Sequence, residues 1–433
     1  MIHKIQVLHI TAHLGGGVGK ALSGLVRNKS GISHRIACLE RPEKLQFVEK
    51  IEGSGTEVIL EPSHLQLRAL INDADIVQVE WWGHPAVMAN LCVTSLPAMR
   101  LVLWCHVSGL HTPIIPIKLI QIAHKCLFTS PCTLETRDVQ SLSAEEKKGI
   151  GVIHSAGGID ELPTPNFDVN EALSAGYMGS LNFAKLHPNY ANFLATISLP
   201  EFRIKMIGDL TNKDILEAQC QKAGCSGILE FRGYCKDIVT ELSSINFMPY
   251  ILNPMHYGTT ENALLEAMAM GVVPIVLNNP AESCLIHHRQ TGLIVQNYEE
   301  FGQAVTWLQK HPEERVRIGR TASESVRKKF PAKSMQNAFS TCYQKLLSQN
   351  KKEIPFRDIL GHNPADWFLS LQKHPALFES SEKKLELPNN FSLYGLLEQT
   401  KGSVFHFCRY FPRDNILKHW EEQITQLKNS LNR

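Results

Sequence analysis

The feature that most constrains the fold is a rhythm of short apolar runs separated by helical patterns, which occurs twice along the 433 residues. The first series has apolar runs at residues 5–10, 33–39, 57–60, 76–80, 101–105, 125–129 and 151–155. The second series has runs at residues 174–178, 203–207, 229–232, 245–249 and 273–277. Near-continuous apolar strands separated by helices are typical of parallel sheets covered on both faces. The pattern therefore predicts an α/β protein with two Rossmann-like domains.

The two series are joined by a segment with the composition of a linker. Gly158, Pro163 and Pro165 interrupt any regular element there. We expect an N-terminal domain over residues 1–160 and a second domain over residues 171–348, because one core rarely supports a chain of this length. Open α/β sheets bind ligands at the carboxyl ends of their strands, so a cleft between the domains is the expected active site.

Residues 351–433 lack the strand–helix rhythm. Trp367, Phe368 and Leu371 form one apolar cluster at helical spacing, and residues 416–431 have the pattern of a charged amphipathic helix. This segment is predicted to be a small helical extension. Acceptor recognition, membrane apposition and contact with a second subunit all stay open as its role.

Composition excludes several partners and compartments. The formal charge of +2 argues against nucleic acid binding. The eleven cysteines are scattered, without a pair at zinc-site or redox spacing, which indicates reduced thiols in the cytoplasm. No run approaches the roughly 20 apolar residues that span a bilayer. Contact with the inner face of a membrane stays open beside the simpler interpretation of a covered helix, through a patch made of Lys118, Lys125 and the apolar residues Ile114, Ile115 and Ile117.

Glycines cluster after the first apolar run, at residues 15–20 (Gly-Gly-Gly-Val-Gly-Lys). Free N–H groups at the start of a helix favour an anion. A P-loop would need a glycine at Leu14 and a hydroxyl at Ala21. A dinucleotide fingerprint would need a glycine at Leu22, although Glu40 stands where the ribose-binding acid of that fold would be. A sugar-phosphate loop and a tight turn without a ligand are the other interpretations.

Three motifs follow one another in the second series. Residues 177–185 read Tyr-Met-Gly-Ser-Leu-Asn-Phe-Ala-Lys, and residues 231–234 read Phe-Arg-Gly-Tyr. Residues 258–274 read Gly-Thr-Thr-Glu-Asn-Ala-Leu-Leu-Glu-Ala-Met-Ala-Met-Gly-Val-Val-Pro. In this order they resemble the retaining GT-B glycosyltransferases of family four, also called group 1. Residues 75–85 and 103–106 of the first half are similar to the same family.

The resemblance spans about residues 1–345 and implies a GT-B fold, with two Rossmann-like domains whose parallel sheets face a cleft. It implies transfer of a sugar from a nucleotide-sugar donor to an acceptor with retention of configuration. The donor would bind mainly to the second domain and the acceptor, a glycan, a lipid-linked molecule or a small molecule, mainly to the first. The family generally needs no metal, and no other cofactor is expected.

The resemblance also implies the donor-binding residues. Glu266 would bind the ribose hydroxyls, for which a carboxylate is a suitable acceptor. Lys185 would lie on the diphosphate, where a cation stabilises the departing charge, and is expected to be catalytic. Gly258, Thr259 and Thr260 would offer backbone N–H groups to the donor.

Further residues complete the predicted site. His106 ends the strand at 101–105 and is expected to be catalytic, touching the donor sugar near the reacting carbon. Tyr234 would line the pocket of the nucleobase, and Gly16 and Gly17 of the glycine loop would contact the donor.

Two positions depart from the family pattern. Ser180 stands where the family has an arginine, and Gly258 where it has a glutamate, with Glu261 three residues further on. These departures keep open an alternative, a nucleotide-sugar-binding protein or partner subunit with reduced catalytic activity. A nucleotide-dependent oxidoreductase is the third hypothesis. The donor sugar, the base, the acceptor and the oligomeric state are not specified by the sequence.

Overall fold

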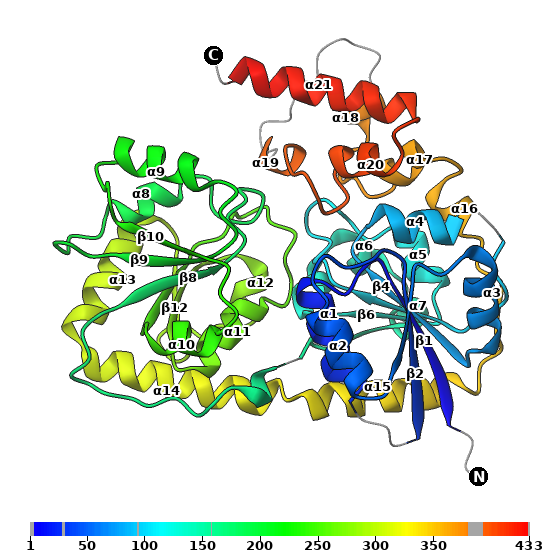
Figure 1. The fold of residues 1–433 in the computed structure, drawn as a ribbon, viewed down its shortest axis with the longest axis horizontal. Coiled ribbons are helices and arrows are strands. Elements are labelled where there is room, and N and C mark those ends of the chain that lie inside the picture. The colour runs from blue at the N-terminus through cyan, green and yellow to red at the C-terminus, as the bar shows by residue number, and fades with distance from the viewer. Residues whose placement is uncertain (1–3, 28–30, 93–94, 157, 380–392, 432–433) are drawn as a thin grey trace. The chain divides into compact units, whose positions relative to one another are not determined.

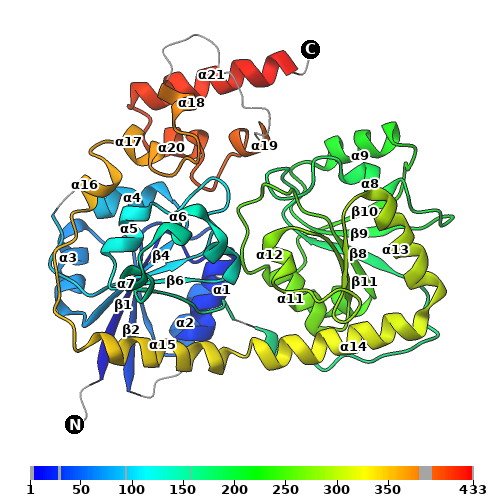
Figure 2. The ribbon, with the colours of Figure 1, turned by 180° about the vertical axis from the view of Figure 1, so that it is seen from behind.

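The computed structural model describes residues 4–27, 31–92, 95–156, 158–379 and 393–431. The chain folds into two compact units, each with its own parallel sheet (Figures 1 and 2). Unit 1 consists of residues 1–157, Tyr257–Thr260 and 332–433. Unit 2 consists of residues 158–256 and 261–331.

Unit 1 contains, within its described residues, a seven-stranded parallel sheet of order β3-β2-β1-β4-β5-β6-β7. Its strands are β1 (Ile5–Thr11), β2 (Ile32–Cys38), β3 (Glu57–Leu60), β4 (Ile76–Trp81), β5 (Leu101–Cys105), β6 (Lys125–Phe128) and β7 (Ile150–Val152). The order reverses between β1 and β4, and ligands bind such sheets at the carboxyl ends of the strands that flank this reversal. The glycine loop follows β1, and His106 follows β5, the neighbour of β4.

Helices cover this sheet. They are α1 (Gly16–Leu25), α2 (Gln46–Gly53), α3 (His64–Asp73), α4 (Pro85–Cys92), α5 (Ile117–Ile122), α6 (Arg137–Ser141), α7 (Ala144–Lys147) and the 3₁₀ turn η1 (Pro131–Glu135). α3 begins with a capping box in which Ser63 and Gln66 exchange hydrogen bonds, which satisfies N–H groups at the helix start. Ile115 is buried and Ile117 packs against the core of unit 1, as expected for a covered helix.

The segment from residue 332 onward also belongs to unit 1. α15 (Ala332–Leu346) packs against α1, and its Phe339 and Tyr343 are fully buried. The remaining helices are α16 (Phe356–Leu360), α17 (Pro364–Leu369), α18 (Ala376–Glu379), α19 (Leu393–Leu396), α20 (Val404–Tyr410) and α21 (Asn415–Leu431). Phe368, Phe407 and Trp420 share one hydrophobic core with residues of α4. The described residues of this segment, 351–379 and 393–431, thus form helices, as predicted, and contribute to the core of unit 1.

Unit 2 contains, among its described residues, a six-stranded parallel sheet of order β10-β9-β8-β11-β12-β13. Its strands are β8 (Ala175–Gly179), β9 (Ile204–Gly208), β10 (Leu229–Gly233), β11 (Phe247–Tyr250), β12 (Val273–Leu277) and β13 (Leu293–Val295). Its helices are η2 (Ile159–Glu161), α8 (Tyr190–Leu194), α9 (Lys213–Lys222), α10 (Ile238–Ser243), α11 (Asn262–Ala269), α12 (Pro280–Ser283), α13 (Tyr298–Lys310) and α14 (Pro312–Lys329). Here the order reverses between β8 and β11.

The two parallel sheets confirm the predicted α/β architecture. Every apolar run of the sequence corresponds to a strand, and only β13, with three residues, has no predicted counterpart. The compact units divide the chain differently from the boundaries 1–160, 171–348 and 351–433, because the apolar face of α15 is buried in unit 1. No helix of the described residues has the length and apolar character of a membrane span.

Candidate functional site

The loop that follows β8 is held against the end of β9 by two glycines. Gly179 and Gly208 end their strands with φ angles of 154° and 147°. A Cβ atom on Gly208 would lie 2.0 Å from the carbonyl oxygen of Gly179, so only glycine permits this approach. The backbone N–H of Leu181 then donates to a carboxylate oxygen of Asp209, at 3.1 Å. The loop is therefore anchored at the carboxyl edge of the sheet, beside the strand reversal.

Lys185 ends this loop in an ion pair with a buried carboxylate. Its Nζ lies 2.8 Å from Oε2 of Glu261, whose side chain is 2% exposed. The hydroxyl of Tyr250 donates to the same oxygen at 2.6 Å. Burial by itself would raise the pKa of the Glu261 carboxyl, but the charges of Lys185 and His256 and the two hydrogen bonds lower it below its ordinary value. Glu261 is therefore ionised at neutral pH.

A second buried pair lies next to the first. His256 Nε2 is 3.0 Å from Oε1 of Glu282, and both side chains are buried. Burial alone would lower the pKa of His256, but the negative charges of Glu282 and Glu261 raise it. Unit 2 thus carries paired positive and negative charges at the carboxyl ends of β8 and β11. We call Lys185, Glu261, His256 and Glu282 the ionic cluster.

Glu266 lies on α11, which begins directly after Glu261 of the ionic cluster. The helix is apolar on its buried side, with Leu264, Leu265 and Ala267 in the core, and Glu266 itself is 7% exposed. Glu266 is therefore a nearly buried carboxylate on an otherwise apolar helix face.

The two remaining predicted residues of unit 2 are more exposed. Ser180 Oγ accepts a hydrogen bond from Nδ2 of Asn182, at 2.9 Å. The neutral hydroxyl that stands at the expected arginine position is therefore bonded to another residue of the same loop. Tyr234 follows β10 and is 54% exposed. It is accessible to a ligand from solvent.

In unit 1, His106 follows β5 and is fixed by a buried carboxylate. Its Nε2 lies 2.7 Å from Oε2 of Glu80, which is fully buried in β4. The other oxygen of Glu80 bonds His9 Nδ1 at 3.1 Å and accepts from Gln78 Nε2 at 2.8 Å. Burial would raise the pKa of Glu80, but the hydrogen bonds and charges of His106 and His9 lower it. The carboxylate is therefore ionised and orients the His106 ring.

This network continues away from His106. His9 Nε2 lies 2.9 Å from His34 Nδ1, and burial followed by the charge of His9 lowers the pKa of His34 well below its ordinary value. The hydroxyl of Tyr343 in α15 donates to Gln78 at 2.6 Å. The polar groups inside the sheet of unit 1 are thus connected to one another, as buried polar groups must be.

Residues Tyr257–Thr260 belong to unit 1 and bond the end of β6. Thr259 and Thr129 share a hydrogen bond of 3.0 Å between their hydroxyls, and the Thr260 hydroxyl donates to the carbonyl of Thr129 at 2.6 Å. Gly258, which precedes the two threonines, is buried. Gly16, with φ of 61°, and Gly17 begin α1 and are exposed, so their backbone is open to a ligand.

The predicted site residues therefore fall into two groups. Gly16, Gly17, His106 and residues 258–260 lie in unit 1, at the carboxyl edge of its sheet. Ser180, Lys185, Tyr234 and Glu266 lie in unit 2, in segments that follow β8, β10 and β11.

Two partners of these residues were not among the predicted site residues, Glu80 for His106 and Glu261 for Lys185. One indication of each was present in the sequence: Glu80 is an acidic residue at the end of an apolar run, and Glu261 is an acidic residue just before an apolar helix.

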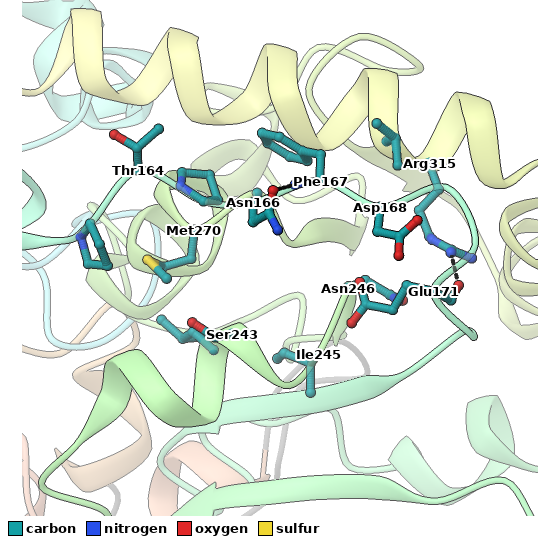
Figure 3. Close-up of a pocket in the computed structure, with 15 residues that line it drawn as sticks. Thr164, Asn166, Phe167, Asp168, Glu171, Ser243, Ile245, Asn246, Met270 and Arg315 are labelled. Carbon is teal, nitrogen blue, oxygen red and sulfur yellow. Dashed lines mark hydrogen bonds between the residues drawn. The ribbon is translucent and has the colours of Figure 1, made fainter.

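A cavity of about 260 Å³ lies at the other edge of the sheet of unit 2 (Figure 3). Phe167, Asn246, Met270 and Arg315 are among the residues that line it. These residues come before the amino ends of β8, β11 and β12 or from α14. The cavity is therefore separate from the segments that carry Lys185 and Glu266.

Comparisons with known proteins concern the second half of the chain and the fold. The family model described as "Glycosyl transferases group 1" matches residues 167–325, most of unit 2, and this stretch contains Ser180, Lys185, Tyr234 and Glu266. No curated protein sequence matches the chain.

Solved glycosyltransferase structures share the whole two-sheet architecture. A glycosyltransferase from Rickettsia africae has a TM-score of 0.64 at 15% identity, covering 80% of this chain and 100% of that one. HepE of Anabaena, in complex with UDP-glucose, has a TM-score of 0.63 at 13% identity, over 79% of this chain and 100% of that one. Sucrose-phosphate synthase of Thermosynechococcus elongatus has a TM-score of 0.57 at 14% identity, over 80% and 100%. The chain therefore has the GT-B fold of these enzymes, and its residues 167–325 match the group 1 glycosyl transferases.

Proposed function

We propose that this protein is a glycosyltransferase that moves a sugar from a nucleotide-sugar donor to a hydroxyl of an acceptor, with retention of configuration and without a metal ion or other cofactor. The donor binds to unit 2, and the acceptor, a glycan or a lipid-linked molecule, binds to unit 1. The alternative of a nucleotide-dependent oxidoreductase has no support from the matched family.

One observation carries the proposal. Lys185 stands at the carboxyl edge of the sheet of unit 2, held at 2.8 Å by the buried Glu261, and the helix with the nearly buried Glu266 begins one residue later, all within the stretch that matches the family. A cation and a carboxylate at the ligand edge of a Rossmann-like sheet suit the diphosphate and the ribose of one donor.

The reaction we propose breaks the bond between the anomeric carbon and the diphosphate oxygen and forms one to the acceptor oxygen on the same face of the sugar. The acceptor proton passes to the leaving diphosphate. Lys185 stabilises the charge that develops on that diphosphate, which lowers the barrier only because the interaction strengthens in the transition state. His106, oriented by Glu80, donates a hydrogen bond to the transferred sugar.

The remaining predicted residues bind the donor in this proposal. Glu266 accepts hydrogen bonds from the ribose, and Tyr234 lines the base pocket. Ser180, residues 258–260 and the backbone of Gly16 and Gly17 contact phosphate or sugar oxygens.

The test is release of nucleoside diphosphate from a panel of nucleotide sugars, with and without saccharide acceptors. Because a solved relative in fold is described in complex with UDP-glucose, UDP-sugars are the first donors to try. Glu266→Ala and Lys185→Ala should each lower turnover by about 10²–10³-fold. Glu324→Ala and Lys222→Ala, at exposed positions of unit 2, are the matched controls. Equal turnover in all four variants would rule out a role of Glu266 and Lys185 in the reaction.

A second candidate is a nucleotide-sugar-binding protein or partner subunit that does not transfer the sugar. It is favoured by one observation, that the charge of Lys185 is offset by Glu261 while the neutral Ser180 replaces a second cation. Calorimetry separates the two candidates, because donor binding without diphosphate release in any mixture is expected for the binding protein alone.

A further inference from the structure

Three histidines from distant parts of the chain meet in unit 1. His13 precedes the glycine loop, His84 follows β4, and His406 lies on α20 of the C-terminal segment. The rings of His84 and His406 lie 4.5 Å apart, centroid to centroid, and those of His13 and His84 lie 5.6 Å apart. Trp82 packs edge-on against both His13 and His84. We call His13, His84 and His406 the histidine cluster.

Backbone N–H groups fix the same tautomer in all three rings. Nδ1 of His13 accepts from the N–H of Gly15 at 3.1 Å, and Nδ1 of His84 accepts from that of Ala86 at 3.1 Å. Nδ1 of His406 accepts from the N–H of Gly402 at 3.2 Å. An Nδ1 that accepts has no proton, so each neutral ring carries its proton on Nε2 as a donor.

The rings also stay neutral. Burial, followed by the charge of Lys401, lowers the pKa of His13 to about 4. Burial, followed by neighbouring histidines, lowers the pKa of His84 to about 2. Burial, followed by the charges of Arg409 and Lys401, lowers that of His406 to about 4. At neutral pH the cluster therefore presents three uncharged donors.

Hydrogen-bond acceptors stand beside these donors. Oε2 of Glu40 lies 3.5 Å from Nε2 of His84, and the ring of Tyr410 lies 6.4 Å from that of His84. Within the described part of the chain, Nε2 of His13 and Nε2 of His406 make no hydrogen bond. His13, His406, Glu40 and Tyr410 are only partly buried.

This set suits a hydroxyl group. A hydroxyl both donates and accepts, so it can bond Glu40 and an imidazole N–H together, whereas a phosphate only accepts and would face the carboxylate. The geometry does not suit a metal, since the described residues contain no group of three histidine, cysteine, aspartate or glutamate side chains placed to hold one.

A close backbone contact joins the C-terminal segment to the histidine cluster. Gly83 and Gly402 both have φ of 74°, and a Cβ on Gly402 would lie 2.6 Å from the carbonyl oxygen of Gly83. Ser403 caps α20 by accepting from the N–H of His406, at 3.2 Å. The position of His406 is therefore set by backbone geometry on one side and by helix capping on the other.

We propose that the C-terminal segment completes a subsite in unit 1 that binds an uncharged, hydroxyl-rich acceptor, a carbohydrate, through the Nε2–H groups of His13 and His406 and the carboxylate of Glu40, beside the buried His84. The inference rests on the proposed function, whose acceptor it specifies. It gives residues 401–410 a direct part in acceptor choice.

The experiment uses the full chain with UDP-sugars as donors. Acceptors are neutral methyl glycosides and disaccharides, with their 6-phosphates as charged counterparts. The variants are His406→Ala, His406→Gln, which keeps an N–H donor, and His419→Ala, an exposed histidine of α21, as the control. Measured are the acceptor KM, the Kd of UDP and the melting temperature.

We expect transfer to a neutral saccharide, with an acceptor KM about tenfold higher in His406→Ala and a smaller increase in His406→Gln. The Kd of UDP and the melting temperature should stay as in the wild type, and His419→Ala should change nothing. An unchanged KM in His406→Ala, or transfer only to the phosphorylated acceptors, would overturn the proposal.

Direct saccharide binding, followed by saturation-transfer NMR without a donor, keeps this inference separate from the proposed function. If no nucleotide sugar is bound or turned over, the proposed transferase fails. Saccharide binding that is lost in His406→Ala still supports the subsite. Absence of saccharide binding by the wild-type chain counts against it.

Discussion

The two units have the same kind of parallel sheet but carry different polar groups at its carboxyl edge, a cluster of neutral imidazoles in unit 1 and ion pairs in unit 2. In unit 1, imidazoles whose Nδ1 atoms accept from backbone N–H groups stay neutral. In unit 2, Lys185 pairs with Glu261 and His256 with Glu282, so the edge keeps its charges and balances them. The difference matches the ligands that we propose, because neutral imidazole donors suit an uncharged acceptor hydroxyl whereas a diphosphate needs a cation.

The largest expected effect is that acid destabilises unit 1. The folded pKa values of His13 and His406, about 4, and of His84, about 2, lie below the ordinary value of 6.5. The unfolded state therefore binds more protons below pH 6.5, so the stability from these groups is present above pH 6.5 and lost as the pH falls. By pH 5 each histidine should cost about 1–2 kcal/mol. Burial, followed by the charge of Glu61, raises the pKa of Glu40 to about 6. Protonation of this single group therefore stabilises the folded state as the pH falls, which offsets part of the loss from the three histidines.

Unit 2 should respond less to the same change. Its His256 has a raised pKa, so its contribution is fully present below pH 6.5 and is lost only as the pH rises through the folded value. This offsets His187, whose pKa burial lowers to about 4. Of the six tryptophans, Trp307 alone belongs to unit 2, so fluorescence of a Trp307→Phe chain follows unit 1. Equal acid sensitivity of both units, measured by hydrogen exchange, would contradict the comparison.

Removal of the buried carboxylate of unit 1 should come next in size. Glu80→Ala leaves the donors of His106, His9 and Gln78 without their shared acceptor, at a cost of about 3 kcal/mol in the free energy of unfolding. Urea denaturation measures this change. Glu57→Ala, on an exposed position of β3, is the control and should stay within about 0.5 kcal/mol.

In unit 2, Lys185→Met should cost about 2 kcal/mol in the free energy of unfolding, because it leaves Glu261 buried without its cation. Breaking a fully buried pair costs more, but the Lys185 side chain is 20% exposed and water screens the interaction. The double variant Lys185→Met, Glu261→Gln should recover most of this loss without restoring diphosphate release. Additive losses in the two single variants would show that the pair is not coupled.

The smallest expected effect is on the affinity for UDP, without a change in stability. Glu266→Gln should weaken the affinity for UDP by about tenfold, since it replaces a charged acceptor with an amide, and should leave the melting temperature unchanged. Isothermal titration calorimetry measures the affinity. A large fall in melting temperature with unchanged UDP affinity would make Glu266 a structural residue of α11.

The architecture was predictable because apolar runs mark buried strands wherever they are long enough. β13 was not predicted because its apolar run, Leu293–Val295, has only three residues and carries no period, whereas the equally short β7 coincides with the longer predicted run at residues 151–155. The segments of Lys185 and Glu266 could be found from motifs. The pairs Lys185–Glu261 and His106–Glu80 could not, because their members are 76 and 26 residues apart in sequence and meet only through the sheet topology.

The histidine cluster shows the same limit more strongly. Nothing in the local sequence around His406 relates it to His13 or His84. The aromatic spacing of residues 367–378 predicts a helix, but it does not indicate which surface of the molecule that helix covers. Packing against α4 supplies that information, and packing depends on the assembled core of unit 1.

Because unit 1 is made of the two ends of the chain, its assembly has a fixed order during synthesis. Unit 2 has all its residues once position 331 has left the ribosome, while the sheet of unit 1 still lacks α15 and the aromatic side chains Phe368, Phe407 and Trp420 of its core. Domains usually fold from the amino terminus onward as they emerge. Here the core of unit 1 has all its residues only after its last helices are synthesised, so we expect unit 2 to fold first.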